Sequence, residues 1–241
     1  ALARYQQAAT GFRAAADLAG EGHTLKNMAQ IHADQRDYEA AEHLLDSALA
    51  ICRKLGSVRL TAQTLCELAD LNLRRDRPAE AADTFGSVLQ WMQDTGDIIG
   101  QSYALTGLGN ARRMLGDLMG AESALNTALE LTLGGDDRLV RARILLALAE
   151  LDQTNESGIL ALTRIDQAIK LLRQLRSAKI WHARALELLG RIHHQAGRAS
   201  IAQHAWQSAI ELAGTADPAL TSQLAEELAS SIRQDGEELA G

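Results

Sequence analysis

The sequence repeats with a period of about 40 residues, and a fixed period of this length constrains the possible folds more than any other feature. Ala41, Ala81, Ala121 and Ala161 are evenly spaced, and the register continues at Ala202 after a one-residue insertion. Such a period is typical of stacked supersecondary units that bury a continuous core between neighbours. The chain is therefore expected to form an array of similar units.

The second half of each unit carries an apolar stripe with helical spacing. In the third unit the stripe consists of Ala121, Leu125, Ala128 and Leu129. Small and large residues alternate at i, i+4, i+7 and i+8, which is one face of an α-helix. We name this predicted segment helix B of the unit.

The first half of each unit carries a second stripe, which we name helix A. In the third unit it contains Leu105 and Leu108, and a small residue follows directly. That small residue recurs in every unit as Ala29, Ala69, Gly109, Ala149 and Gly190. A larger side chain there would keep helix B from approaching to the ~8 to 10 Å of close helix packing. These positions are predicted to set the crossing distance.

Glycine, proline and aspartate interrupt the stripes at regular intervals, so each helix is expected to end in a short turn. We predict one all-α domain over residues 1–241, a right-handed α-α superhelix of about 12 antiparallel helices. The expected segments are a lone helix B at 1–20, helix pairs at 22–56, 58–96, 98–135, 138–176 and 179–214, and a capping helix at 217–235. Because the chain opens without Met and the helical pattern begins at its first residue, we expect it to be part of a longer protein.

These patterns resemble the tetratricopeptide repeat, with the segment from Leu105 to Leu129 matching best. The usual unit of that family has about 34 residues, so the helices here are about one turn longer. The tyrosine expected late in helix A is replaced by His32, Asn72, Arg112, Asp152 and His193. Long repeats rich in alanine and arginine are also similar in style to the C-terminal region of bacterial STAND transcription activators of the antibiotic-regulatory and maltose-regulator type.

The resemblance implies a partner-binding groove, because in tetratricopeptide proteins the A helices line the inner face of the array. The residues predicted to face this groove include Cys66 and Leu146. The candidate binding residues are Lys26, Gln30, Asp70, Tyr103, Thr106, Asn110, Arg113, Arg143, Glu150, Arg184, Glu187 and Arg191. An amide at the place of Asn110 is implied to hydrogen-bond the backbone of an extended ligand.

Arginine gathers on the predicted face toward the C-terminal half, at Arg113, Arg143, Arg184 and Arg191. Guanidinium groups bind carboxylates through two parallel N–H donors, so an acidic peptide would suit this strip. The alternative is a solvated face that Glu150 and Glu187 partly neutralise. The two-carboxylate clamp of chaperone-binding relatives is disfavoured, since Gln30 and Glu67 stand where that clamp needs amides.

Composition and motifs exclude several other functions. A net charge of −7 opposes a nucleic-acid surface, and no apolar run approaches the ~18 residues that a membrane span needs. Cys52 and Cys66 form no CxxC pair, which favours a reducing, cytoplasmic location. We expect no enzyme activity, cofactor or metal site, because no catalytic motif occurs and the adjacent His193 and His194 diverge by about 100° on a helix.

The sequence therefore predicts a protein-interaction module that binds a peptide, or another domain of the same longer chain. We expect it to be the regulatory or sensor region of a larger bacterial transcription regulator. A free-standing adaptor is one alternative, and a small-molecule receptor or enzyme-associated subunit with an enclosed pocket is another. Oligomer formation through exposed Tyr5 and Phe12 also stays open. Trp206 is predicted to lie in the core, and Trp91 and Trp181 are candidate exposed anchors.

Overall fold

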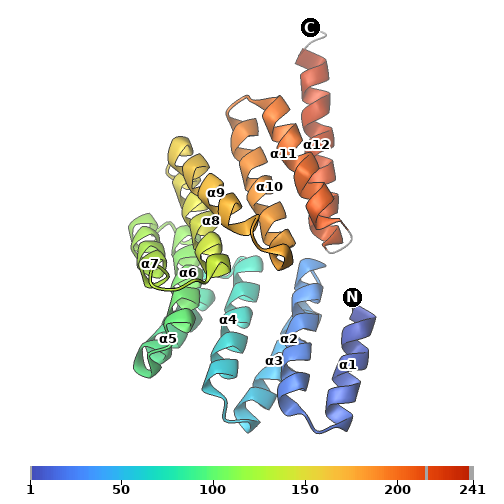
Figure 1. The fold of residues 1–241 in the computed structure, drawn as a ribbon, viewed down its shortest axis with the longest axis vertical. Coiled ribbons are helices and arrows are strands. Elements are labelled where there is room, and N and C mark those ends of the chain that lie inside the picture. Colours follow the sequence, from blue (N-terminus) through green and yellow to red (C-terminus); the bar gives the residue numbers. More distant parts are fainter. Residues whose placement is uncertain (1, 215–216, 239–241) are drawn as a thin grey trace. The chain divides into compact units, whose positions relative to one another are not determined.

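A computed structural model describes residues 2–214 and 217–238, with side chains described for all of these except residues 176 and 234–238. Within this part of the chain there are twelve α-helices and no strand (Figure 1), so the predicted all-α fold class is confirmed. Ala1, the first residue of the predicted lone helix, and Thr215 and Ala216, which separate two predicted helices, lie outside the described residues.

The helices follow one another as a lone helix, five pairs and a last helix. The A helices are α2 (Leu18–Asp34), α4 (Val58–Arg74), α6 (Ile98–Met114), α8 (Arg138–Thr154) and α10 (Lys179–Gln195). Their B helices are α3 (Tyr38–Lys54), α5 (Pro78–Thr95), α7 (Leu118–Leu131), α9 (Gly158–Leu172) and α11 (Ala199–Ala213). The lone first helix is α1 (Leu2–Ala14), the last is α12 (Pro218–Glu238), and a short 3-10 helix, η1 (Arg176–Ala178), precedes α10.

The helix pairs group into two compact units, each of which contains more than one of the 40-residue repeats. Residues 1–132 contain α1 to α7, and residues 133–241 contain α8 to α12. In each unit the two helices of a pair pack against each other, and each B helix that is followed by an A helix of the same unit also packs against it. The single uninterrupted array stays a prediction from the sequence.

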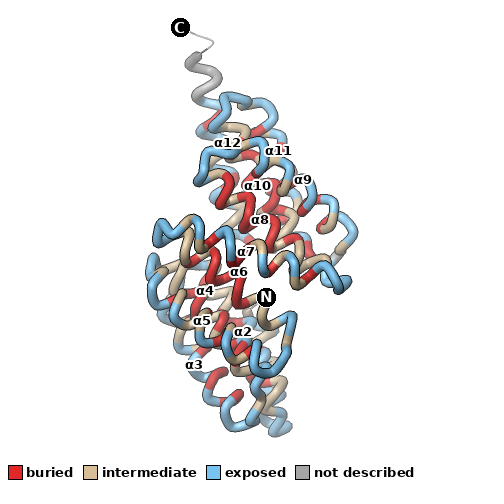
Figure 2. Tube along the Cα trace, turned by 90° about the vertical axis from the view of Figure 1, so that its left-hand side faces the viewer, coloured by how far each residue is buried: buried red, intermediate tan, exposed pale blue. Residues whose placement is uncertain are grey.

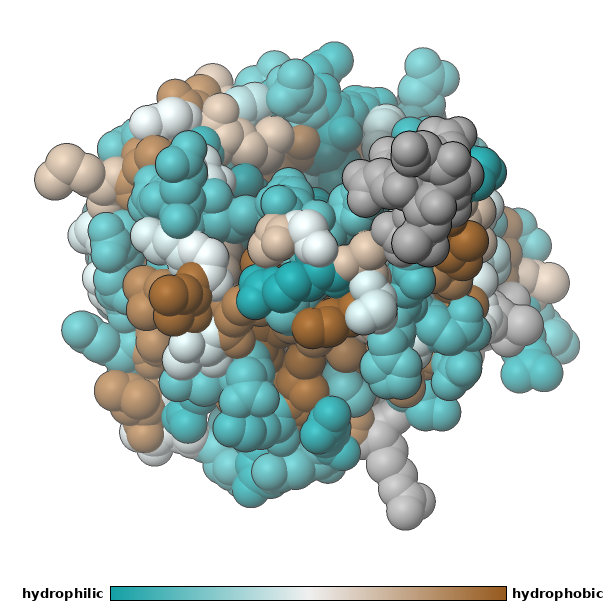
Figure 3. Space-filling model, turned by 90° about the horizontal axis from the view of Figure 1, so that it is seen from above, coloured by the Kyte–Doolittle hydropathy of each residue, from teal (hydrophilic) through white to brown (hydrophobic). Residues whose placement is uncertain are grey.

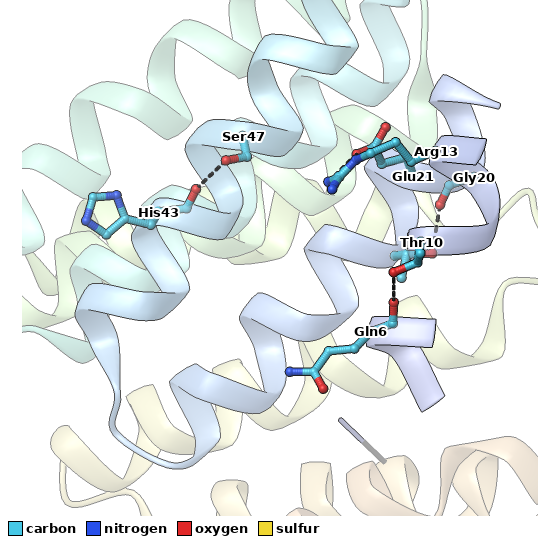
Figure 4. Close-up of polar contacts among 8 residues, drawn as sticks. Gln6, Thr10, Arg13, Gly20, Glu21, His43 and Ser47 are labelled. Carbon is cyan, nitrogen blue, oxygen red and sulfur yellow. Dashed lines mark hydrogen bonds and ion pairs between the residues drawn. The ribbon is translucent and has the colours of Figure 1, made fainter. Parts of the chain in front are cut away.

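The first helix is shorter than the expected residues 1–20. It ends at Ala14 because Ala16 adopts the left-handed conformation, with φ of 56°, and Asp17 then starts α2 by accepting a hydrogen bond from the Gly20 backbone at 2.9 Å. Arg13 of α1 binds Glu21 of α2, with 2.6 Å between guanidinium Nη2 and carboxylate Oε1 (Figure 4). This pair ties the lone helix to its neighbour.

Two regular features build the turns. Every turn from helix A to helix B contains one residue with positive φ, namely Arg36, Asp76, Gly116, Glu156 and Gly197. Aspartate side chains cap helices by accepting a hydrogen bond from the backbone N–H three residues later, at Asp17, Asp37, Asp97, Asp117, Asp137 and Asp217. Such caps satisfy backbone donors that have no partner inside the helix.

Most residues of the two predicted stripes are buried in the core, together with residues outside the stripes such as Leu71 and Met92. Figure 2 shows the buried segments in red. The repeated alanine of the first pair, Ala41, and its four equivalents are all 0% exposed. A Cβ on Gly109 would lie 2.6 Å from Cγ of Leu125, and one on Gly190 would lie 2.4 Å from Nε1 of Trp206. The prediction that small residues set the crossing distance is therefore confirmed.

Candidate functional site

Neighbouring A helices lie side by side within each unit, and polar contacts join them. In the first unit, Arg74 of α4 donates to Asp34 of α2 at 2.7 Å, and the Tyr103 hydroxyl of α6 donates to Asp70 of α4 at 3.2 Å. In the second unit, Gln153 of α8 donates to Gln195 of α10 at 2.7 Å. Each unit therefore presents a face made of adjacent A helices.

The predicted binding residues of the first unit are partly buried on this face: Lys26, Gln30, Asp70, Tyr103, Thr106, Asn110 and Arg113. Several of them already have intramolecular partners. Gln30 donates to Asp34 at 3.0 Å, Asp70 and Tyr103 contact each other, and the Thr106 hydroxyl donates to the Ser102 carbonyl at 2.6 Å. The contact between Asp70 and Tyr103 joins two A helices, whereas the other two contacts lie within one helix.

Asn110 differs from its neighbours on α6. Its side-chain oxygen Oδ1 is buried and accepts no hydrogen bond from the described residues. A buried polar atom without a partner costs free energy, and in native proteins such atoms are uncommon. Asn110 therefore offers an acceptor at the place where the resemblance implies contact with a ligand backbone.

The second unit places Arg143 and Arg184 around one tryptophan. The guanidinium carbon of Arg143, on α8, lies 4.5 Å from the centre of the Trp181 ring, and that of Arg184 lies 5.1 Å from it. Trp181 and Arg184 both belong to α10, and all three side chains are partly buried. Trp181, a candidate exposed anchor, is partly buried, and its ring contacts the two arginines that the sequence predicted for this face. Its spacing of three residues from Arg184 is the sequence signal that would have placed it there.

A group of carboxylates lies further along the same A helices. Glu187 pairs with Arg191 at 3.6 Å between Oε1 and Nη1, and its side chain is 15% exposed. Burial raises the pKa of Glu187 above its ordinary value; Glu227 and Glu150 raise this pKa further, whereas Arg191 and Arg184 lower it. The predicted residues Glu150, Arg184, Glu187 and Arg191 therefore act on one another electrostatically.

Two residues predicted for the open face are buried instead. Cys66 of α4 is 2% exposed and Leu146 of α8 is 6% exposed. Cys66 lies in a core cluster with Ala104 of the neighbouring A helix, α6. This register position lies toward the adjacent A helix, so an apolar side chain there is covered by the next helix.

The residues that replace the expected tyrosine late in helix A have a structural role in several repeats. Asp152 of α8 pairs with Arg164 of α9 at 3.2 Å, and their side chains are only 9% and 17% exposed. His32 contacts Asp37 at 3.0 Å, and Arg112 donates to the Gly120 carbonyl at 3.1 Å. These polar contacts join helix A to helix B or to the turn between them.

The surface also has apolar patches and an open depression outside the predicted site. Met119 and Ile159 are each 86% exposed, and Figure 3 shows apolar patches among hydrophilic side chains on the face that it views. A depression of about 810 Å³ in the first unit is lined by α5, α6 and the turn that follows, including Gly86, Leu108 and Arg112. It contains none of the predicted binding residues.

Part of the chain matches a known protein family. Residues 20–94 match the tetratricopeptide repeat family. This match covers nearly all of the helices from α2 to α5. The three remaining helix pairs continue the same tetratricopeptide-like pattern. No curated protein sequence matches the chain.

Solved structures with tetratricopeptide-like folds are similar to the chain over most of its length. BtubC from P. vanneervenii has 18% identity and a TM-score of 0.62, covering 89% of this chain and 90% of that one. The Rap conjugation gene regulator of plasmid pLS20, solved with a Phr peptide, has 15% identity and a TM-score of 0.69, covering 85% and 56%. A STAND protein with a tetratricopeptide repeat sensor from Pyrococcus horikoshii has 13% identity and a TM-score of 0.53, covering 91% and 37%.

These similarities establish the fold. Among the described residues, no helix has the length and apolar character that crossing a lipid bilayer requires.

Proposed function

We propose that the chain is a protein-interaction module that binds a peptide segment on the face formed by its A helices. The observation that carries this proposal is the arrangement of Arg143, Trp181 and Arg184, in which two neighbouring A helices present cationic and aromatic groups together. Tryptophan and arginine contribute more binding energy at protein interfaces than most other residues. The buried acceptor of Asn110 supports a similar role for the first unit.

The proposed role is recognition without catalysis, within a larger bacterial regulator located in the cytoplasm. Two proteins of similar fold support this part of the proposal, since one is a gene regulator solved with a peptide and the other is a STAND protein with a tetratricopeptide repeat sensor. The partner is a peptide, or another domain of the same longer chain. The full open reading frame tests this context, because nucleotide-binding and DNA-binding segments are expected in a regulator and not in a free-standing adaptor.

A small-molecule receptor would need an enclosed pocket with converging polar groups. The depression lined by Gly86, Leu108 and Arg112 is open, so it does not favour that alternative.

The binding proposal is tested by capture on an array of random peptides. Asn110→Ala removes the buried acceptor in the first unit, and Arg184→Glu reverses one charge beside Trp181 in the second. Both variants are expected to capture less peptide than the wild type while circular dichroism shows unchanged helicity. Equal capture by the wild type and both variants would exclude the A-helix face as the binding site.

A further inference from the structure

Arg143 and Arg184 occupy the same register position on adjacent A helices. Their separation in the sequence equals the repeat period plus the one-residue insertion. Both arginines lie near the N-terminal ends of their helices, α8 and α10, and both guanidinium groups contact the Trp181 ring. The contact with the ring restricts two long side chains, so less side-chain entropy remains to be lost when they bind a partner.

The surroundings of this cluster are basic although the whole chain is acidic. Arg138 and Arg141 lie in the first turn of α8, Arg173 follows the end of α9, and Lys179 begins α10. The acidic residues at this end are Asp136, which pairs with Arg138 at 3.0 Å, and Asp137, which caps α8. In a chain of net charge −7, this is a local concentration of positive charge.

Two acidic side chains, Glu187 and Glu150, lie on the same two helices, and Arg184 already acts on Glu187, whose pKa it lowers. Glu187 is mostly buried and pairs with Arg191 at 3.6 Å. Glu150 lies about two turns beyond Arg143 on α8, because seven residues of helix separate them. The N-terminal ends of α8 and α10 add the positive ends of two helix dipoles to the same region.

Resting on the proposed function, we infer that this cluster is the subsite for an acidic stretch of the bound peptide, with Arg143 and Arg184 donating to its carboxylates and the Trp181 ring packing against the peptide chain. Each guanidinium has five N–H donors in a planar fork that matches a carboxylate. A contact through the face of the guanidinium with the indole ring leaves this fork geometry unchanged. A single-stranded nucleic acid is a weaker fit, because such ligands bind along grooves with several stacking aromatic residues, and this cluster contains one.

The test measures the binding of labelled hexaglutamate by fluorescence anisotropy, with hexaglutamine and a thymidine hexanucleotide as comparison probes. Hexaglutamate is expected to bind most tightly and to change the tryptophan fluorescence. Arg143→Gln and Arg184→Gln are each expected to weaken its binding by about tenfold, the effect of one charge-assisted hydrogen bond. Trp181→Phe keeps an aromatic ring and is expected to retain more affinity than Trp181→Ala.

Arg53→Gln is the matched control, because it removes the same charge from an exposed position on α3 in the other unit. It is expected to change the affinity for hexaglutamate less than twofold, because an exposed charge is screened by solvent and salt. Equal losses in Arg53→Gln and Arg143→Gln would overturn the inference, as would tighter binding of the hexanucleotide.

The outcomes separate this inference from the proposed function. If the peptide array shows capture that depends on Asn110 but not on Arg184 or on peptide charge, the acidic subsite is wrong and the binding module stands. If neither the array nor any labelled peptide shows binding, both are wrong.

Discussion

Gly107 of α6 occupies a place where no side chain fits. A Cβ at this position would lie 2.2 Å from Cζ of Phe85, and Phe85 is 0% exposed, so its ring has no room to move. Gly107→Ala is therefore expected to lower the free energy of unfolding by about 1 to 3 kcal/mol, as overpacked core substitutions do. Chemical denaturation measures this change.

Gly86 of α5 provides the control, because a Cβ there would meet no atom within 4 Å. Gly86→Ala is expected to raise the free energy of unfolding by up to about 1 kcal/mol, since alanine favours a helix more than glycine does. If Gly107→Ala and Gly86→Ala shifted the free energy of unfolding in the same direction, close packing against Phe85 would not explain why position 107 needs glycine.

The Glu187 carboxyl gives the second unit a specific pH dependence. Burial raises its pKa in the folded state, so protonated Glu187 favours folding. This contribution is fully present below the pKa of the unfolded chain and is lost as the pH rises through the higher folded-state pKa. Glu187→Gln stays neutral and is expected to be more stable than the wild type at neutral pH.

Thermal unfolding between about pH 4 and pH 8 measures the effect of Glu187, since an unperturbed glutamate titrates near pH 4.3. The wild type is expected to lose stability relative to Glu187→Gln as the pH rises through this range. Glu122→Gln, at an exposed position on α7, is the control and is expected to follow the wild type. Parallel pH profiles for all three proteins would contradict this role of Glu187.

Single residues were predictable from the sequence where the repeat fixes their environment. The need for a small residue at Gly109 and Gly190 could be predicted because all five helix pairs share the same crossing. Cys66 and Leu146 were misplaced because their burial depends on the rotation between neighbouring A helices, which the stripe of one helix does not specify. The pairing of Trp181 with Arg143 joins residues from two helices and could not be read from either stripe.

The turns between A and B helices show how individual elements are connected. Arg36 and Glu156 have φ of 61° and 57°, a conformation that costs a residue with a Cβ roughly 1 to 2 kcal/mol. Replacement by glycine relieves this strain but adds freedom to the unfolded chain. The net expectation for Arg36→Gly or Glu156→Gly is a gain of about 0.5 to 1 kcal/mol in the free energy of unfolding.

Thermal unfolding of these two variants tests the turn geometry. Gly116, with φ of 81°, holds the equivalent place in the third pair, and Gly116→Ala is expected to lower the melting temperature. A lower melting temperature in both glycine variants would contradict the proposed strain at these positions.

The helices could be located from the sequence because their stripes are regular, whereas the first helix was predicted too long. The left-handed residue at its end is Ala16, and alanine carries no turn signal. The regular series of aspartate caps at the helix N-termini was also not predicted from the sequence. Asp17, Asp37, Asp97, Asp117 and Asp137 are separated from one another by multiples of half the repeat period.

At the scale of the whole molecule, the structure divides the chain into residues 1–132 and 133–241. The repeat pattern contained no signal for this division, because the stripes continue in register through Ala121 and Ala161 on its two sides. Each unit nevertheless carries its own face of adjacent A helices. We therefore propose that the A helices recognise the peptide and that the B helices behind them support the A helices.

Hydrogen exchange with a peptide selected from the array tests this assignment most directly, because bound peptide slows exchange where it covers or orders the backbone. We expect added protection in the A helices, above all in the first two turns of α8 and α10, which contain Arg143 and Arg184. Protection confined to the B helices α9 and α11, or to the depression beside Gly86, would contradict the account.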